Sequence, residues 1–192
     1  MAQEIVDHIE KYLGTIQRGW GPDALEHKRF QIIECRSQAD PSVTAYATLG
    51  LHRHALPSWK NPTKLIRHEL FVLTPTSTGK QHFPEIVEQV AAETLDRQRP
   101  YLRGEVIGPR GRLADGFPME ALYVSLPAVF SQEFAACSVE GNDVAIAMLI
   151  PITGQEAAFI GKSGWSAFED KLVETGVDVV DLSRRCVCSH EG

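Results

Sequence analysis

The chain has few cysteines, no long apolar run and no signal-peptide pattern in its first residues, and each of these features argues against a class of protein. Four cysteines in 192 residues are too few for a disulfide framework, which favours a reducing cytoplasm. No apolar run approaches the roughly 20 residues that a membrane helix needs. The N-terminal sequence MAQEIVDHIEKYLG carries acidic residues where a signal peptide has a basic and then an apolar region. We therefore expect a cytoplasmic protein with no membrane partner.

Positive charge is not in excess either. The formal net charge is −6, and it is unevenly distributed along the chain. Residues 1–100 hold 12 basic and 12 acidic side chains, whereas residues 101–192 hold 7 basic and 13 acidic ones. Proteins that bind nucleic acid usually present basic patches, so we expect no nucleic-acid partner. The acidic second half is compatible with a basic protein partner, or it only keeps the protein soluble.

Internal repeats and low-complexity segments are also absent from the sequence. The length fits one large domain or two small ones. A region rich in Gly, Pro and Arg near residue 108 is the one candidate boundary, but each half alone would make a poor core. We therefore expect a single domain over residues 1–185 and a flexible C-terminal tail over residues 186–192.

The clearest structural pattern lies near the C-terminus. Val144–Ile150 is uniformly apolar, which is typical of a strand buried on both faces, and we expect Pro151 to end it. Thr153 and Glu156 have the spacing of a capping box, in which each side chain binds the other residue's backbone N–H. The pattern therefore predicts a central strand, a short loop and a capped helix that ends at Gly161.

Hydrophobic periodicity predicts the other elements. Helices are expected at residues 3–13, from Pro84 to before Pro100, and from Ser163 to Gly176. Strands are expected at Arg29–Cys35, Val43–Leu51, Lys64–Leu73, Glu105–Ile107 and Ala121–Leu126. Turns, loops or irregular segments are expected at residues 19–22, 39–42, 52–62 and 127–142. Strands that cluster, rather than alternate strictly with helices, favour the α+β class.

Three histidines form the sharpest indication of an enzyme. His52 and His54 are two residues apart on an extended segment and would point to the same side, as in some metal sites. His68 or Glu69 on the next strand could add a third ligand. In the alternative interpretation, the two histidines are loop residues and Glu69 pairs with an Arg or Lys of the sheet. A metal site needs three or four supported ligands, so we expect no metal.

Two further segments carry residues of chemical interest. Cys186 and Cys188, with His190, could bind a soft metal, but they lie where chain ends are flexible. The Gly-rich segment Arg103–Arg112 could contact phosphate, but no helix start follows it, which favours a solvated hairpin loop. We expect neither segment to hold a cofactor.

The tryptophans and acidic residues suggest how the chain could bind a protein. Trp165 lies on the apolar face of the last predicted helix, which indicates a core position. Trp59 lies in a loop flanked by prolines, where it could anchor a partner or fold over the sheet edge. We expect an acidic surface around the last helix, formed by Glu169, Asp170, Glu174, Asp178 and Asp181.

Three segments together resemble the suppressor of fused domain family. Tyr46–Pro57, with the sequence YATLGLHRHALP, resembles a family strand that ends in a Thr-x-Gly-Leu-Ser type turn. Arg67–Pro75 has an acidic residue that opens an apolar strand, as in the family. Leu149–Leu172 resembles the family's Pro-Ile-Thr-x-x-Glu segment with the two helices that follow, and Asp181–Arg184 resembles its closing Asp-Leu-x-Arg. Order and spacing agree over roughly residues 1–185.

The resemblance implies a mixed, largely antiparallel sheet packed with helices, in a domain that binds protein and catalyses no known reaction. One residue departs from the pattern, because His52 stands where small polar residues are usual. We expect a bacterial, stand-alone member without the C-terminal region of the animal proteins. Animal members hold a transcription factor inactive, and bacterial members include immunity proteins that neutralise toxins.

Three functions therefore stay open at this point. The first is a non-catalytic inhibitor, such as an immunity protein against a basic toxin. The second is a metal-dependent hydrolase that uses His52, His54 and His68. The third is a regulator that sequesters a transcription factor.

Overall fold

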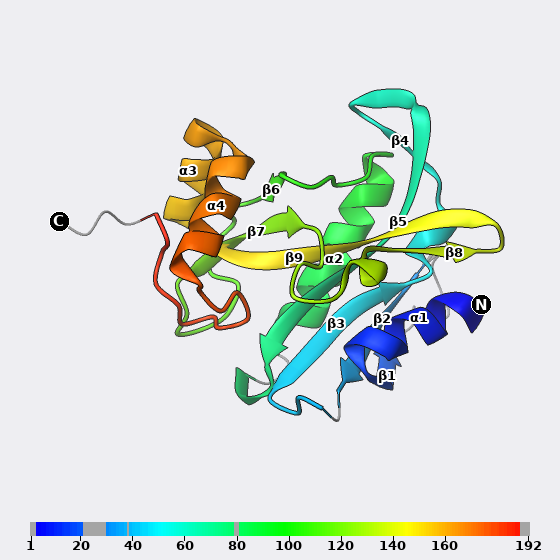
Figure 1. Cartoon of the computed structure of the whole chain (residues 1–192), viewed down its shortest axis with the longest axis horizontal. Coiled ribbons are helices and arrows are strands. Elements are labelled where there is room, and N and C mark those ends of the chain that lie inside the picture. The colour runs from blue at the N-terminus through cyan, green and yellow to red at the C-terminus, as the bar shows by residue number, and fades with distance from the viewer. Residues whose placement is uncertain (1–2, 21–29, 38, 79–80, 189–192) are drawn as a thin grey trace.

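The chain folds into a mixed sheet with helices on both faces (Figure 1). The computed structural model describes residues 3–20, 30–37, 39–78 and 81–188. The strands are β1 (Thr15–Trp20), β2 (Gln31–Arg36), β3 (Val43–Leu49), β4 (Leu56–Ser58), β5 (Asn61–Pro75), β6 (Val106–Ile107), β7 (Met119–Ser125), β8 (Ala136–Val139) and β9 (Asn142–Thr153). Their order in the sheet is β1-β2-β3-β5-β9-β7-β6, with β4 paired to β5 and β8 paired to β9.

All strand pairs are antiparallel except β5 with β9, which is parallel. The α+β class with a mixed, largely antiparallel sheet is therefore confirmed. The sheet continues across the candidate boundary near residue 108, because β6 pairs with β7. This continuity supports a single domain over residues 1–185, which stays a prediction.

Four α-helices and three short 3-10 helices complete the described fold. They are α1 (Gln3–Leu13), α2 (Phe83–Asp96), α3 (Gly154–Ser163), α4 (Trp165–Thr175), η1 (Leu51–Arg53), η2 (Thr76–Thr78) and η3 (Gln132–Ala135). The helices α1, α3 and α4 pack on one face of the sheet, and α2 covers the other face (Figure 1). No helix in the described part of the chain is long and apolar enough to cross a membrane.

The sheet separates two hydrophobic cores. In β5, Phe71 and Leu73 point to the core beneath α1, α3 and α4, while Leu70 and Val72 point to the core beneath α2. This follows from the two-residue period of a strand. Central strands therefore have little exposed surface, and even Thr48 of β3 is fully buried.

The predicted capping box at the end of β9 is confirmed. The backbone N–H of Thr153 donates to Glu156 Oε2 at 2.9 Å, and the Glu156 N–H donates to Thr153 Oγ1 at 3.2 Å. No loop separates β9 from α3, and α3 ends at Ser163 rather than at Gly161.

The prediction that Pro151 ends the strand is wrong, because β9 continues to Thr153. Pro151 pairs with Leu122 of β7, whereas pairing with β5 stops at Met148. At Pro151 the strand therefore has a neighbour on only one side, and such positions tolerate a residue without an N–H.

Three strands lie where the sequence pattern predicts turns or irregular structure. The predicted turn at residues 19–22 is wrong at Gly19 and Trp20, which belong to β1; residues 21 and 22 lie outside the described residues. Strand β4 lies in the predicted loop 52–62, and β8 lies in the predicted irregular segment 127–142. All three are short strands that gain regular structure by pairing with longer neighbours.

The segment after α4 is fastened to the beginning of α3. The Arg184 side chain is 2% exposed and binds the carboxylate of Glu156. The Val187 N–H donates to Glu156 Oε1 at 3.0 Å, and Val187 and Cys188 pack against the core. Residues 186–188 therefore lie against the body rather than in the flexible tail predicted over residues 186–192. Residues 189–192 lie outside the described residues.

Candidate functional site

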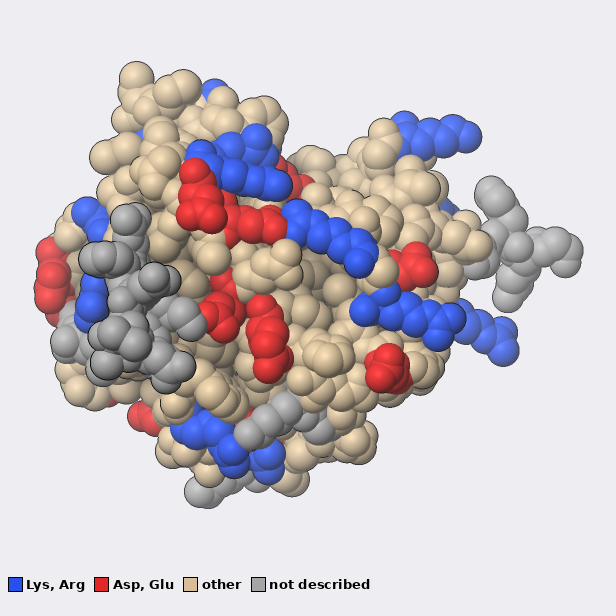
Figure 2. All heavy atoms as spheres, turned by 180° about the vertical axis from the view of Figure 1, so that it is seen from behind, with Lys and Arg blue, Asp and Glu red and all other residues tan. Residues whose placement is uncertain are grey.

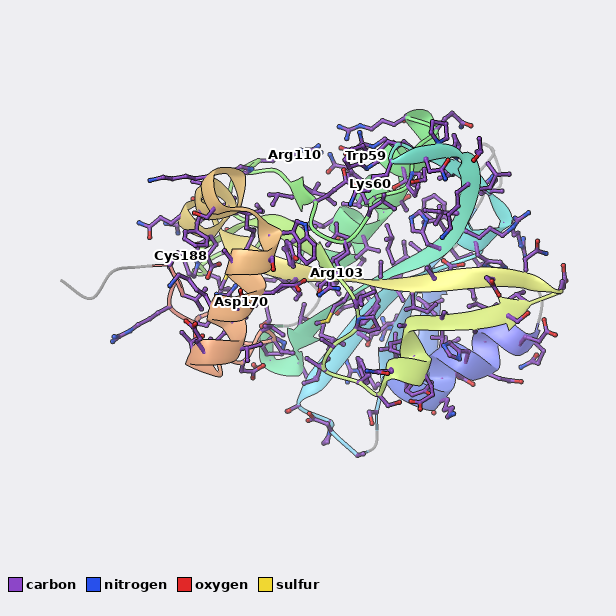
Figure 3. All side chains as sticks on the ribbon, turned by 45° about the horizontal axis from the view of Figure 1, so that its top comes forward. Trp59, Lys60, Arg103, Arg110, Asp170 and Cys188 are labelled. Carbon is purple, nitrogen blue, oxygen red and sulfur yellow. The ribbon has the colours of Figure 1, made fainter. Side chains whose placement is uncertain are left out.

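Two of the predicted acidic residues lie on the outer side of α4. Asp170 and Glu174 are one turn apart and exposed, and Figure 3 shows Asp170 on this helix. Neither forms an ion pair within the described residues. Between them lies Val173, which is 83% exposed. The helix therefore presents two charged carboxylates around an apolar side chain.

Asp178 and Asp181 follow the end of α4. Together with Asp170 and Glu174 they form what we call the acidic stretch. Asp178 Oδ1 accepts the Val180 N–H at 2.9 Å. Asp181 Oδ1 accepts the N–H of Ser183 at 2.8 Å and its hydroxyl at 2.6 Å, and these hydrogen bonds lower the pKa of Asp181. The two carboxylates shape the turn through one oxygen each.

Glu169 differs from the other four predicted acidic residues. The Arg103 Nε donates to Glu169 Oε1 at 3.0 Å, the Arg103 Nη2 binds Oε2, and the Tyr123 hydroxyl donates to Oε1 at 2.7 Å. Burial, together with this hydrogen bond, raises the pKa of Tyr123. Glu169 therefore ties α4 to β7 and to the segment before β6, and its charge is matched by Arg103.

Trp165 is not a core residue, contrary to the sequence prediction. Its side chain is 36% exposed, and the Arg103 guanidinium lies over its ring at 4.8 Å from the centroid. Gly104 lies under the same ring with a φ of 96°, and a Cβ added there would be 2.6 Å from Trp165 Cδ1. The indole is thus packed against the backbone at Gly104, where any side chain would clash with the ring and the positive φ favours glycine.

An apolar groove of about 260 Å³ adjoins the acidic stretch. It lies between the end of α1, the outer ends of β3 and β5, the segment before η3, and the turn after α4. Its apolar lining includes Tyr12, Leu73 and Val129, and Val129 is 51% exposed. Asp40 and Asp178, both exposed, also line the groove. An apolar hollow with two carboxylates suits a partner with an apolar side chain next to basic ones.

Trp59 lies at the other end of the molecule, at the tip of the β4–β5 hairpin (Figure 3). It is 49% exposed, and its Nε1 donates to Glu105 Oε2 at 3.4 Å. The Arg99 guanidinium is 5.3 Å and the Lys60 ammonium 5.4 Å from the centroid of its ring. The indole therefore rests partly on the segment around residues 99–105 and keeps part of its surface open.

The histidine cluster has an arrangement that the sequence did not indicate. Glu69 is 1% exposed, and its Oε1 accepts the N–H of Gly50 at 2.8 Å, the N–H of His52 at 3.2 Å and the ring Nδ1 of His52 at 2.5 Å. Its Oε2 accepts the Thr48 hydroxyl. The prediction that Glu69 pairs with an Arg or Lys is therefore wrong. Gly50 has a φ of 105°, a conformation that favours glycine, in the turn that brings its N–H to this carboxylate.

The three histidines do not converge on one point. His52 is 7% exposed rather than an open loop residue, and His68 points to the opposite face of β5 from Glu69. His68 is buried without a protein partner for either ring nitrogen in the described structure, and burial lowers its pKa to about 4. Among the described residues, no group of three His, Cys, Asp or Glu side chains is placed to hold a metal ion.

The structure also shows the surroundings of the cysteine pair and of the Gly-rich segment. Cys186 and Cys188 are free and half-buried, burial raises the pKa of Cys188 to about 11, and His190 lies outside the described residues. In the Gly-rich segment, two of the three arginines bind carboxylates: Arg103 binds Glu169, and Arg110 binds Glu93 of α2. These two arginines are therefore already paired within the chain.

The face covered by α2 carries both signs of charge (Figure 2). Positive and negative side chains lie next to each other there, as in the Glu93 contacts with Arg97 and Arg110. A charged partner would meet no single sign on that face. Asp170 and Glu174, which have no ion-pair partner in the part of the chain that the structure describes, lie instead on α4, which packs on the opposite face of the sheet.

Comparison with solved structures identifies the fold. A SUFU (suppressor of fused protein) homolog from Neisseria gonorrhoeae FA 1090 is 18% identical, with a TM-score of 0.76 over 98% of this chain and 97% of the homolog. A chain of the Sufu–Fu complex is 12% identical, with a TM-score of 0.69 over 95% of this chain and 90% of that one. Drosophila Suppressor of Fused is 13% identical, with a TM-score of 0.66 over 96% of this chain but only 50% of the Drosophila chain.

A comparison with curated proteins finds no match to the chain. The comparison with family models, in contrast, agrees with the structural comparison. The family model described as Suppressor of fused protein (SUFU) matches residues 26–185, which is most of the sequence. The chain therefore belongs to the suppressor of fused family.

Proposed function

We propose that this suppressor of fused domain works by binding a protein partner through the apolar groove and the acidic stretch beside it. The observation that carries the proposal is the groove itself, with Val129 exposed in its lining and Asp40 and Asp178 next to it. A large apolar side chain can fill such a hollow, and buried anchors of this kind supply most of the affinity in protein interfaces. The unpaired carboxylates would steer a basic partner toward it.

The relatives support the same kind of role. One of the similar structures was solved as a Sufu–Fu complex, in which that protein is bound to another protein. The family match over residues 26–185 covers the strands, helices and turns that build the groove, apart from the end of α1.

The finer proposal is that the chain is a cytoplasmic inhibitor, such as an immunity protein that neutralises a basic toxin. An acidic inhibitor gains association rate from charge complementarity, which matters when a toxin must be bound before it acts. A regulator that sequesters a basic transcription factor would use the same surface, so the identity of the partner separates the two.

The first experiment is affinity capture with the tagged protein from the cell in which the chain is native, followed by mass spectrometry. We expect one stoichiometric basic protein. A toxin would support the inhibitor role, and a transcription factor would support the regulator instead. Capture of no stoichiometric protein would contradict the proposal.

The second experiment locates the surface on the domain. We expect the triple variant Asp170→Lys/Glu174→Lys/Asp178→Lys to lower the association rate constant about tenfold or more at low salt, and to flatten its salt dependence. The control on the other face is Glu85→Lys/Asp96→Lys, two exposed acidic residues of α2, and it changes the net charge by two units less than the triple variant. In Val129→Asp, the dissociation rate constant should rise. If the triple variant and Val129→Asp both bind like the parent, the groove is not the interface.

A further inference from the structure

A second cavity, of about 370 Å³, lies at the opposite end of β3 from the groove. Its walls are the η1 turn with His52 and Arg53, the side chain of Arg67 on β5, and the turn between β8 and β9. None of these residues belongs to the proposed protein-binding surface, so a ligand in this cavity would be independent of the protein partner.

His52 is held rigidly in the wall of this cavity. Its ring Nδ1 is 2.5 Å from Glu69 Oε1, an oxygen that also accepts two backbone N–H groups. A carboxylate oxygen in this position is an acceptor, so Nδ1 carries the proton. The other ring nitrogen, Nε2, makes no hydrogen bond within the described part of the chain. The buried carboxylate therefore fixes the orientation of an imidazole that lines the cavity and leaves Nε2 available to a ligand.

Arg67 is positioned by the same turn. Its Nη1 donates to the backbone oxygen of His52 at 3.1 Å and to that of Arg53 at 2.9 Å. Two carbonyl acceptors on one nitrogen fix the guanidinium, while Nε and Nη2 find no acceptor within the described residues. Arg53 contributes its own exposed side chain to the cavity wall. One wall thus combines two positive charges with donors that are oriented before any ligand arrives.

Among the residues that line the opposite wall, one is acidic. Glu140, at the β8–β9 turn, lines the cavity, and its N–H donates to Glu4 Oε2 at 2.9 Å. Asn142 is also in this wall, and its side-chain amide donates to the Glu140 backbone oxygen at 3.2 Å. The Glu140 carboxylate would repel an anion, but the two guanidiniums opposite outnumber it. Glu69 adds a negative charge behind His52, and the doubly protonated His52 ring that would donate to the anion balances it.

We infer that this cavity binds a small oxyanion, a phosphate or a carboxylate group, through His52 Nε2 and the free guanidinium nitrogens of Arg67. Guanidinium groups and protonated imidazole form short, charge-assisted hydrogen bonds with such groups. The volume leaves room for the oxyanion and the first atoms attached to it. Donation from Nε2 to the anion requires a proton on this nitrogen as well as on Nδ1.

The test titrates the full-length protein with inorganic phosphate and, separately, with acetate, at constant ionic strength made up with chloride. The readout is the imidazole nitrogen resonance of His52 in long-range proton–nitrogen NMR spectra. We expect a saturable shift with at least one anion. Saturation with phosphate alone would assign the phosphate class, and saturation with acetate alone would assign the carboxylate class. Saturation with neither anion would overturn the inference.

Variants establish that the anion binds in this cavity. Arg67→Gln should weaken binding about tenfold, since a charge-assisted hydrogen bond is lost. Arg53→Gln, at an exposed position that the fold does not need, should weaken it by about threefold. Glu140→Gln should strengthen it, and Arg185→Gln, an exposed arginine outside this cavity, serves as the control for overall charge. If Arg53→Gln and Glu140→Gln both bind phosphate and acetate like the parent, the anion binds elsewhere and the inference is wrong.

Discussion

Glu156 and Arg184 form a buried, two-point ion pair that joins the beginning of α3 to the end of the described chain. Arg184 Nη1 lies 2.6 Å from Glu156 Oε1, Nη2 lies 3.0 Å from Oε2, and Nη2 also donates to the Pro151 backbone oxygen at 3.0 Å. Both side chains are nearly inaccessible to solvent. The same carboxylate closes the capping box with Thr153, so one side chain organises the strand end, the helix start and the C-terminal segment.

Breaking this pair from one side should destabilise the protein strongly. We expect Arg184→Met to lower the free energy of unfolding by about 3–5 kcal/mol, because the Glu156 carboxylate is left buried without its cation. Urea denaturation followed by circular dichroism measures this. The neighbouring Arg185 is exposed, and Arg185→Met should stay within about 0.5 kcal/mol of the parent. Equal effects of the two substitutions would show that the buried pair is not what holds the segment.

Glu169 and Asp170 are neighbours on α4, but we expect their substitution to change the free energy of unfolding by different amounts. Glu169→Gln weakens the contact with Arg103 and exchanges the charged acceptor of the buried Tyr123 hydroxyl for a neutral one, so we expect a loss of about 1 kcal/mol in unfolding free energy. Asp170→Asn, at an exposed position without an ion pair among the described residues, should change it by less than about 0.5 kcal/mol. Thermal or urea denaturation of the two variants decides between a structural Glu169 and one that belongs to the acidic surface.

Local patterns were the part of the fold that the sequence could predict. The capping box of Thr153 and Glu156 depends on residues three positions apart, and it is present as expected. Strands β4 and β8 could not be predicted in the same way, because each is only three or four residues long. They are regular only because β5 and β9 offer backbone groups to pair with, and that partner is invisible in a short window of sequence.

The candidate site was predictable only in its charges. Asp178 could be named from the acidic composition around α4, but the groove next to it could not. Its apolar lining comes from Tyr12, Leu73, Val129 and Val180, which only the folded sheet brings together. For Glu169 the missing information was its partner Arg103, which lies 66 residues away in the sequence. Long-range pairing of this kind leaves no local signal.

Trp59 remains a predicted partner contact, and its two roles can be separated. Because the side chain is 49% exposed, we expect Trp59→Ala to lower the free energy of unfolding by only about 1 kcal/mol. If Trp59 is an anchor in a protein interface, Trp59→Ala should also weaken binding to the captured partner by about 2 kcal/mol or more. Calorimetric titration of the partner measures this, with Leu65→Ala, a 60%-exposed apolar residue of the same hairpin, as the comparison. An unchanged affinity in Trp59→Ala would remove the hairpin tip from the interface.

The buried His68 should make the protein less stable in mild acid. Its pKa is about 4 in the folded protein, because burial disfavours the charged ring, compared with an ordinary value of 6.5. Between these two values the unfolded chain binds a proton that the folded chain does not, so stability falls as the pH drops from about 6.5 to 4. The expected loss is on the order of 3 kcal/mol over this window.

His68→Leu tests this explanation, because neither ring nitrogen has a protein hydrogen-bond partner to lose in the described structure. We expect the variant to lose less stability than the parent between pH 6.5 and pH 4, as measured by urea denaturation at several pH values. An identical pH dependence in parent and variant would assign the acid sensitivity to other groups.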